Sequence, residues 1–183
     1  MNTKVRSLTR RKLVSRVFIA CALAFGFAKV QAENKFNDPE IAHIAYTASA
    51  IDIRYAHLAL ALSENPEIRN FAELMIRDHS AVNKKALALV QKLNVTPQDN
   101  AMSRQLNEQA EKIRNELSQL RGAAFDQRYA ANELAYHQAV NQAVEKQFIP
   151  SVKNAEFRAL LIAALQTFKA HESHAEMMTK NVM

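Results

Sequence analysis

Four prolines divide this chain into long stretches that contain almost no helix-breaking residues. Proline is excluded from helix interiors, so helices begin or end next to it, and glycine, the other common breaker, occurs only twice in 183 residues. Ala, Leu, Gln, Glu and Lys, which favour helices, are abundant. A sheet of many strands would need more turn residues. The sequence therefore predicts an all-α protein.

Apolar residues recur at helical spacing in five stretches, of which the third has the thinnest apolar stripe. We expect helices over about 39–63, 66–93, 101–121, 123–149 and 154–181, the fourth stopping at Pro150. Asp38 and Asn65, each followed by Pro-Glu, are predicted to cap the first two. The first two long helices are joined by a short connection, and so are the last two, whereas the connection between the two pairs is long and contains the third helix. This arrangement favours a ferritin-like four-helix bundle with an additional crossover helix.

The first 32 residues have the composition of an export signal. Six Lys or Arg residues precede an apolar run from Val17 to Ala28, and Val30-Gln31-Ala32 offers small residues for cleavage. The run of about a dozen residues is shorter than the roughly 20 needed to cross a bilayer, although an uncleaved anchor stays an alternative. Thr9 to Leu13 partly matches a twin-arginine signal, an alternative to the general secretory route. We predict a periplasmic or otherwise exported domain over 33–183.

The positive charge of the chain is concentrated in this leader. Residues 1–32 hold seven of the 24 Lys and Arg residues and none of the 18 Asp and Glu residues, which leaves the rest with a net charge of −1. Nucleic-acid binding requires a basic surface on the folded part, so we expect no nucleic-acid partner. Cys21 also lies in the leader, and the mature chain therefore has no disulfide, thiol nucleophile or cysteine metal ligand.

The stretch from Phe125 to His137 interrupts an apolar helix face with ionisable residues. On a helical wheel, Glu133 lies at the centre of an arc of aromatic and aliphatic residues, and His137 lies in the same arc. An uncompensated buried carboxylate is costly, so Glu133 needs a cation, a metal or a proton.

Inward-facing polar residues also occur in the other long helices, at Asp52, His79 and His171. At about 1.5 Å per residue, these three lie near the middle of their helices, as Glu133 and His137 do. An antiparallel bundle would bring all five into one layer. Carboxylate and imidazole donors suit iron, manganese or zinc and also copper, so the layer predicts a transition-metal site for metal storage, buffering or oxidative-stress chemistry. We expect nearby hydroxyl and carboxyl groups to hold the histidines: Asp126, Tyr129 and Tyr136.

The same layer has two other interpretations. Glu133 can pair with a protonated histidine, in which case the layer only sets the register of the bundle in a non-catalytic envelope protein that binds a partner. A metal-free enzyme is the third interpretation, but no nucleophile elbow or phosphate-binding loop supports it. Glu133 and His137 are four residues apart, whereas carboxylate-bridged di-iron bundles usually space this pair by three, which weakens a dinuclear interpretation.

Several short motifs together resemble a known family. They are Phe71-Ala72 with Met75 and Asp78-His79, Gly122 to Asp126 with Tyr129 and His137, and His171 with Ala175. As a set they are similar to exported bacterial proteins of the DUF4142 family (domain of unknown function 4142), over about Phe36 to Met178. The family pattern has Glu at the position of Asp52 and Leu-Pro at that of Leu165-Gln166.

The resemblance implies a ferritin-like helical bundle, commonly behind a signal peptide and often described as a membrane or outer-membrane protein. It implies no established reaction. An envelope protein partner and a peripheral membrane association stay open, and so does the oligomeric state.

Overall fold

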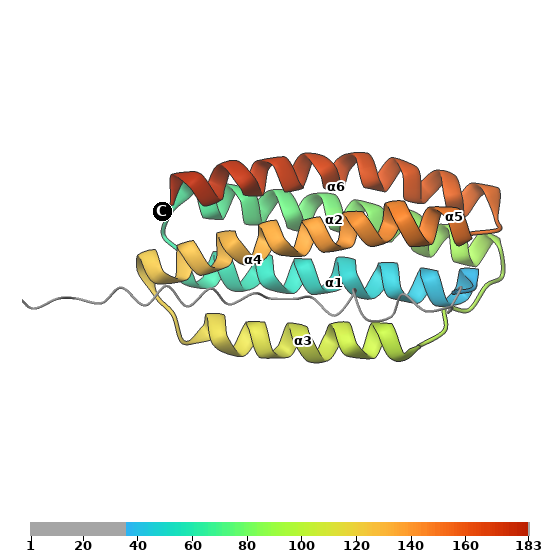
Figure 1. Ribbon diagram of the computed structural model, residues 1–183, viewed down its shortest axis with the longest axis horizontal. Helices are drawn as coiled ribbons and strands as arrows, with labels where there is room; N and C mark the ends of the chain where they lie inside the picture. Colours follow the sequence, from blue (N-terminus) through green and yellow to red (C-terminus); the bar gives the residue numbers. More distant parts are fainter. Residues whose placement is uncertain (1–35, 183) are drawn as a thin grey trace, which may run out of the picture.

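Five long helices form an elongated bundle (Figure 1). The computed structural model describes residues 36–182, so the predicted export signal lies outside the described residues. The elements are α1 (Asp38–Leu62), α2 (Pro66–Lys92), α3 (Ala101–Ser118), α4 (Gly122–Ala143), the π-helical turn η2 (Val144–Phe148), α5 (Ile149–Ser151) and α6 (Ala155–Asn181). Residues 36–182 contain no strand, which confirms the all-α prediction.

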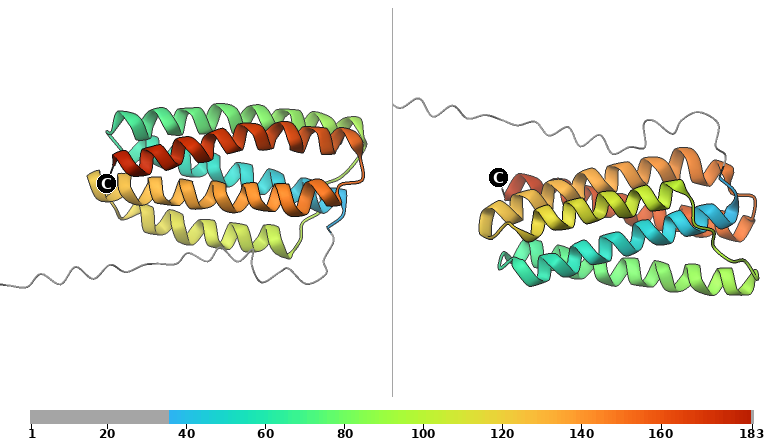
Figure 2. Two further views of the ribbon diagram at one scale, coloured as in Figure 1. Left: turned by 45° about the horizontal axis from the view of Figure 1, so that its top comes forward. Right: turned by 90° about the horizontal axis from the view of Figure 1, so that it is seen from below.

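Four of the helices, α1, α2, α4 and α6, surround the common interior, and α3 lies outside them beside α1 (Figures 1 and 2). α1 and α2 form one antiparallel pair, α4 and α6 form the other, and α2 also contacts α6. α2 and α4 run in the same direction, because α3 carries the chain back along the bundle between them. α3 is therefore the crossover helix that the sequence predicts.

The cap of α1 differs from the prediction. Asn37, not Asp38, is the N-cap: its side chain accepts from the Glu40 N–H at 2.9 Å, and the Glu40 carboxylate accepts from the Asn37 N–H at 2.9 Å. The Asp38 carboxylate instead accepts from the backbone N–H groups of Lys153 and Asn154, at 2.9 and 2.8 Å. Asp38 therefore joins the start of α1 to the start of α6, a contact between distant segments that no local pattern indicates.

Two other helix ends follow from local chemistry. Asn65 caps α2 as predicted, since its side chain accepts from the Glu67 N–H at 2.9 Å. Gly122 begins α4 with a φ of +54°, a conformation that side chains disfavour and glycine adopts freely. α3 ends at Ser118, three residues before the predicted end, so the turn into α4 is longer than expected.

Pro150 does not stop the fourth helix, which corrects the sequence prediction. The chain stays helical through η2 and α5, and the Ile149 N–H bonds the Val144 carbonyl five residues earlier. A proline ring meets the carbonyl four residues before it in a regular α-helix, and the wider π turn ahead of Pro150 relieves this contact. The helix therefore reaches Ser151.

Aromatic side chains pack the end of the bundle at which α1 finishes. Phe71, Phe125 and Tyr129 are completely buried. The rings of Phe125 and Tyr129 stack with their centroids 5.9 Å apart, and Phe71 meets Tyr129 edge to face at 6.4 Å. None of the helices in residues 36–182 is both long and apolar enough to cross a membrane.

Candidate metal centre

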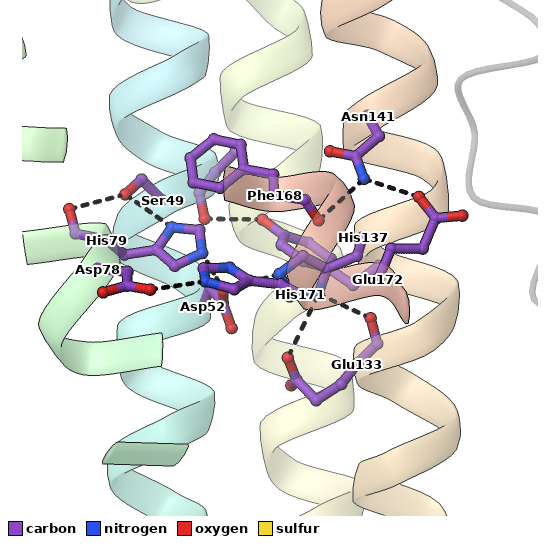
Figure 3. Close-up of polar contacts among 12 residues, drawn as sticks. Ser49, Asp52, Asp78, His79, Glu133, His137, Asn141, Phe168, His171 and Glu172 are labelled. Carbon is purple, nitrogen blue, oxygen red and sulfur yellow. Dashed lines mark hydrogen bonds and ion pairs between the residues drawn. The ribbon is translucent and has the colours of Figure 1, made fainter. Parts of the chain in front are cut away.

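Five ionisable side chains meet in the interior near mid-height (Figure 3). Asp52 comes from α1, His79 from α2, Glu133 and His137 from α4, and His171 from α6. Each is at most 4% exposed. The structure thus brings together all five residues that the sequence places in one layer, because each lies on the inward face of its helix at a similar height.

Two overlapping groups of three residues could hold a metal ion. One contains Asp52, Glu133 and His137, and the other contains His79, His137 and His171. Within each group the potential ligand atoms lie within 4.8 Å of one another. The three imidazole centroids are 5.4 to 5.9 Å apart. His137 belongs to both groups and is the central residue of the site.

The hydrogen bonds of His137 and His171 leave one nitrogen of each ring free. His137 donates from Nδ1 to the Glu133 carbonyl at 2.9 Å, and His171 donates from Nε2 to Asp78 Oδ2 at 2.9 Å. Against the effect of burial, bonds from Arg77 and His171 lower the pKa of Asp78, so its carboxylate is ionised and can accept the bond from His171. Nε2 of His137 and Nδ1 of His171 are buried without a hydrogen-bond partner. A ring held in this way presents the lone pair that binds metals.

His79 is held in the same way by Ser49. Ser49 Oγ lies 3.1 Å from His79 Nδ1 and 3.4 Å from the His79 carbonyl oxygen, and the hydroxyl accepts from Nδ1 in the tautomer that carries the proton there. His79 Nε2 is 2.6 Å from Asp52 Oδ2, yet the two atoms are not aligned as a hydrogen bond. A carboxylate oxygen and an imidazole lone pair this close repel each other unless a proton or a metal cation lies between them.

The two carboxyl groups have opposite pKa shifts. Burial favours the neutral form of Asp52, but His79 and His137 outweigh it and hold the pKa of Asp52 well below its usual range. Burial raises the pKa of Glu133 well above its usual value, and the neighbouring Asp52 carboxylate raises it further. Two carboxylates this close do not ionise together without a cation. Asp52 is therefore ionised, and Glu133 carries a proton that a metal ion would displace.

His137 and His171 are neutral near neutral pH. Burial lowers the pKa of His137 to about 4. Burial also lowers the pKa of His171, although the bond to Asp78 opposes the change. Neutral imidazole is the form that coordinates metals, so these rings need not lose a proton to a competing ion. Together the layer offers oxygen and imidazole donors and no sulfur ligand, a set that suits iron, manganese, zinc or copper.

Comparison with known proteins identifies the family. The model of a domain of unknown function, DUF4142, matches residues 26–178. The chain belongs to the DUF4142 family. This confirms the resemblance carried by the sequence motifs, and the match covers the five layer residues. No curated protein and no solved structure matches the chain.

Two of the three residues predicted to hold the histidines of this DUF4142 protein, Asp126 and Tyr129, do not bond them. Asp126 accepts from the Ser63 hydroxyl at 2.5 Å, away from the layer. The Tyr136 hydroxyl donates to the Ala48 carbonyl at 2.8 Å. The Tyr129 hydroxyl is buried without a hydrogen-bond partner. The sequence prediction is therefore wrong for Asp126 and Tyr129, because helical spacing identifies the inward face but not the direction of each polar group.

Ser49 and Asp78 take this role instead. Ser49 lies one turn before Asp52 on the same helix face, and this i, i+3 spacing was the available signal. Asp78 sits at the edge of the apolar face of α2, and only the packing of α6 against α2 shows that it reaches His171. Metal-binding histidines usually have such a partner on their other nitrogen.

An apolar cavity adjoins the layer in this DUF4142 protein. It has a volume of about 590 Å³ and is lined by residues of all four bundle helices, over 38–49 of α1, 79–90 of α2, 136–143 of α4 and 157–168 of α6. His79 and His137 form part of its wall at the layer. Tyr46 and Leu87, which are 41% and 45% exposed, also line it and mark its mouth. The imidazoles therefore border an open space on one side.

Proposed function

We propose that this DUF4142 protein is an exported metal-binding protein whose mid-bundle layer holds a transition-metal ion. The observation that carries the proposal is the convergence of three imidazoles, each hydrogen-bonded at one nitrogen and without a hydrogen bond at the other, with Nε2 of His79 and of His137 lying 2.6 and 3.5 Å from Asp52 Oδ2. The oxygens of Asp52 and Glu133 complete the donor set. The role that fits best is metal storage or buffering, or protection against oxidative stress.

The unpartnered atoms favour a metal over a purely structural layer. Both oxygens of Asp52, Oε2 of Glu133 and one nitrogen of each of the three histidines are buried without a hydrogen bond. Each buried, unsatisfied polar group costs about 1–3 kcal/mol, and native cores rarely retain several in contact. A layer that only sets bundle register would satisfy these atoms with one another through protons, as between Asp52 Oδ2 and the Nε2 atoms of His79 and His137 at 2.6 and 3.5 Å. A bound cation satisfies them together.

The chain's own residues would do three things at such a site. Asp52 and Glu133 would balance the charge of a divalent ion, and the three histidines would coordinate it from the remaining sides. Ser49 and Asp78 would orient His79 and His171. Iron, manganese or copper would supply redox chemistry when bound, whereas zinc would supply none. The composition of residues 1–32 supports export, and a twin-arginine route would allow loading before export.

Metal analysis of the purified protein tests the proposal. After anaerobic reconstitution with iron, manganese, zinc and copper in turn, the wild type is expected to retain one of them at a fixed stoichiometry by elemental mass spectrometry. Glu133→Ala and His171→Ala are expected to lose most of it. His57→Ala, at an exposed histidine of α1, is the matched control and should bind as the wild type does. A wild type that retains none of the four metals contradicts the proposal.

The alternative is that the layer only sets the register of the helices, in an envelope protein that binds a partner. The 2.6 Å contact between Asp52 Oδ2 and His79 Nε2 favours this alternative if both ring nitrogens of His79 carry a proton. The double substitution Glu133→Gln with His171→Asn separates the two. If the layer only sets the register, the double substitution changes the stability of the protein and leaves its cellular function intact. If the layer is a metal site, the double substitution abolishes metal binding.

A further inference from the structure

The cavity occupies the end of the bundle interior at which α1 begins, which is its hollow end. The wall is mainly apolar and includes six alanines and the rings of Phe148, Phe157 and Phe168. The volume of about 590 Å³ falls within the about 300–1,000 Å³ of known ligand pockets. Apolar cavities of only about 150 Å³ take up benzene in other proteins. Water beside such a wall lacks hydrogen-bond partners, so a ligand that replaces it with apolar surface binds favourably.

The charges around the cavity disfavour an ionic ligand. In the part of the chain that the structure describes, no lysine or arginine lines the cavity, and His43 in its wall already faces Asp99, with 4.0 Å between Nδ1 and Oδ1. Asp38 is the only carboxylate among the described lining residues, and its two oxygens accept the backbone N–H groups of Lys153 and Asn154. A cation would have to compete with these two bonds, and an anion would meet no lysine or arginine. An ion that leaves water without a counter-charge is costly, so the cavity favours an uncharged ligand.

Polar groups of the wall near the layer are already engaged within the protein. His79 has Ser49 Oγ 3.1 Å from Nδ1 and Asp52 Oδ2 2.6 Å from Nε2. The Tyr136 hydroxyl donates to the Ala48 carbonyl at 2.8 Å. A ligand with many polar groups would lose its hydrogen bonds to water here without replacing them. The wall therefore favours a ligand whose surface is mainly apolar.

We propose that the cavity at the hollow end binds an uncharged, mainly apolar small molecule. The apolar wall, the volume and the engaged polar groups support this class of ligand. Tyr46 and Leu87, which are 41% and 45% exposed, provide an apolar entrance at the mouth. The inference goes beyond the proposed function, because it does not require a bound ion.

The charge of the ligand provides the first test. The purified protein is titrated calorimetrically with naphthylmethanol, naphthoate and naphthylmethylammonium, which share one ring system and differ in charge. The uncharged alcohol should bind, and each ion should bind more weakly by about tenfold or more, because it would lose hydration without gaining a counter-charge. Absence of binding by the alcohol overturns the inference, and so does equal or tighter binding of either ion.

Cavity filling provides the second test. Ala86→Phe adds a ring at a lining position of α2 and should weaken binding of naphthylmethanol by about tenfold or more. Ala88→Phe places the same ring at an exposed position of α2 that does not line the cavity, and should bind the alcohol as the wild type does. Circular dichroism confirms that both variants fold, and Ala164→Leu repeats the test on α6 if Ala86→Phe does not. Equal binding by the cavity-filled and control variants contradicts the proposal.

A third variant separates the cavity from the outer surface. Met177 is 56% exposed and does not line the cavity, so Met177→Ser should bind naphthylmethanol as the wild type does. Loss of binding in this variant would assign the ligand to the surface and overturn the inference. Binding of the alcohol by a protein that retains no metal would uphold this inference while the metal proposal fails, so the two results are distinguishable.

Discussion

The two ends of the bundle interior differ in how tightly their side chains are packed, and the ionisable layer separates them. On one side of the layer, the rings of Phe71, Phe125 and Tyr129 contact one another and are completely buried. On the other side, a cavity of about 590 Å³ is lined by six alanines together with larger side chains such as Phe148, Phe157 and Phe168. The same four helices line both ends, so helix packing alone does not explain the difference.

The contrast suggests a division of roles, in which the aromatic end stabilises the fold and the hollow end gives access to the layer. The aromatic end buries the large apolar surface that opposes unfolding, and its rings fix the helices on which Glu133 and His137 lie. The hollow end gives up contacts and gains space next to the imidazoles. A bundle packed tightly at both ends would seal the layer from both directions, whereas here one end is left accessible. The substitutions below test this division.

The largest effect is expected at the aromatic end. Phe71→Ala removes a completely buried ring that contacts Tyr129, and His174 at 5.1 Å, and leaves a cavity. The free energy of unfolding should fall by about 3–5 kcal/mol. Urea denaturation followed by circular dichroism measures the change. A loss below about 1 kcal/mol would show that this end does not carry the stability of the bundle.

A smaller effect is expected at the boundary layer, where Asp78 holds His171. Asp78→Ala removes the acceptor that orients the ring, and metal affinity should fall by about 10–100-fold without loss of the coordinating atoms. Competition with a chromophoric chelator measures the affinity. Asp99→Ala, at a half-exposed acid that bonds Ser103 and Arg104, is the control. Equal affinity of the Asp78 variant and the wild type would exclude this positioning role.

The layer should also make metal binding depend on pH. A metal must displace the proton of Glu133, whose pKa is raised by burial and by Asp52, so apparent affinity should increase with pH by up to about tenfold per unit below that pKa. His137, with a pKa lowered to about 4, adds no competing proton above about pH 5. Glu133→Gln should flatten the profile. Chelator competition between pH 5.5 and 8 gives the slopes, and an unchanged slope in the variant would assign the proton elsewhere.

The smallest effect is expected at the hollow end. Leu160 lines the cavity on α6 and is only partly buried. Leu160→Ala should lower the free energy of unfolding by about 1 kcal/mol in the absence of ligand, because much of the side chain already faces open space. The same urea denaturation as for Phe71→Ala makes the comparison direct. Equal losses at both sites would show that the two ends are equally packed.

Local patterns were sufficient to predict most of the fold and the membership of the layer. Prolines and helical periodicity identified the helices, and α3 was recognised as a crossover by its thin apolar stripe and by the long connection before it. Glu133 and His137 could be placed inward because an apolar arc surrounds them on their own helix. The residues that hold the histidines could not be identified in this way. Asp78 reaches His171 across 93 positions of sequence.

The sequence by itself determined which residues face the interior and at what height, because both follow from the geometry of a single helix. Only the tertiary structure decided what these residues meet. The Asp38 contact with the start of α6, the π turn ahead of Pro150 and the Ser49 contact with His79 all depend on how helices pack. The cavity is the clearest case. The residues that line it lie on all four bundle helices, and the empty space depends on how these helices pack against one another.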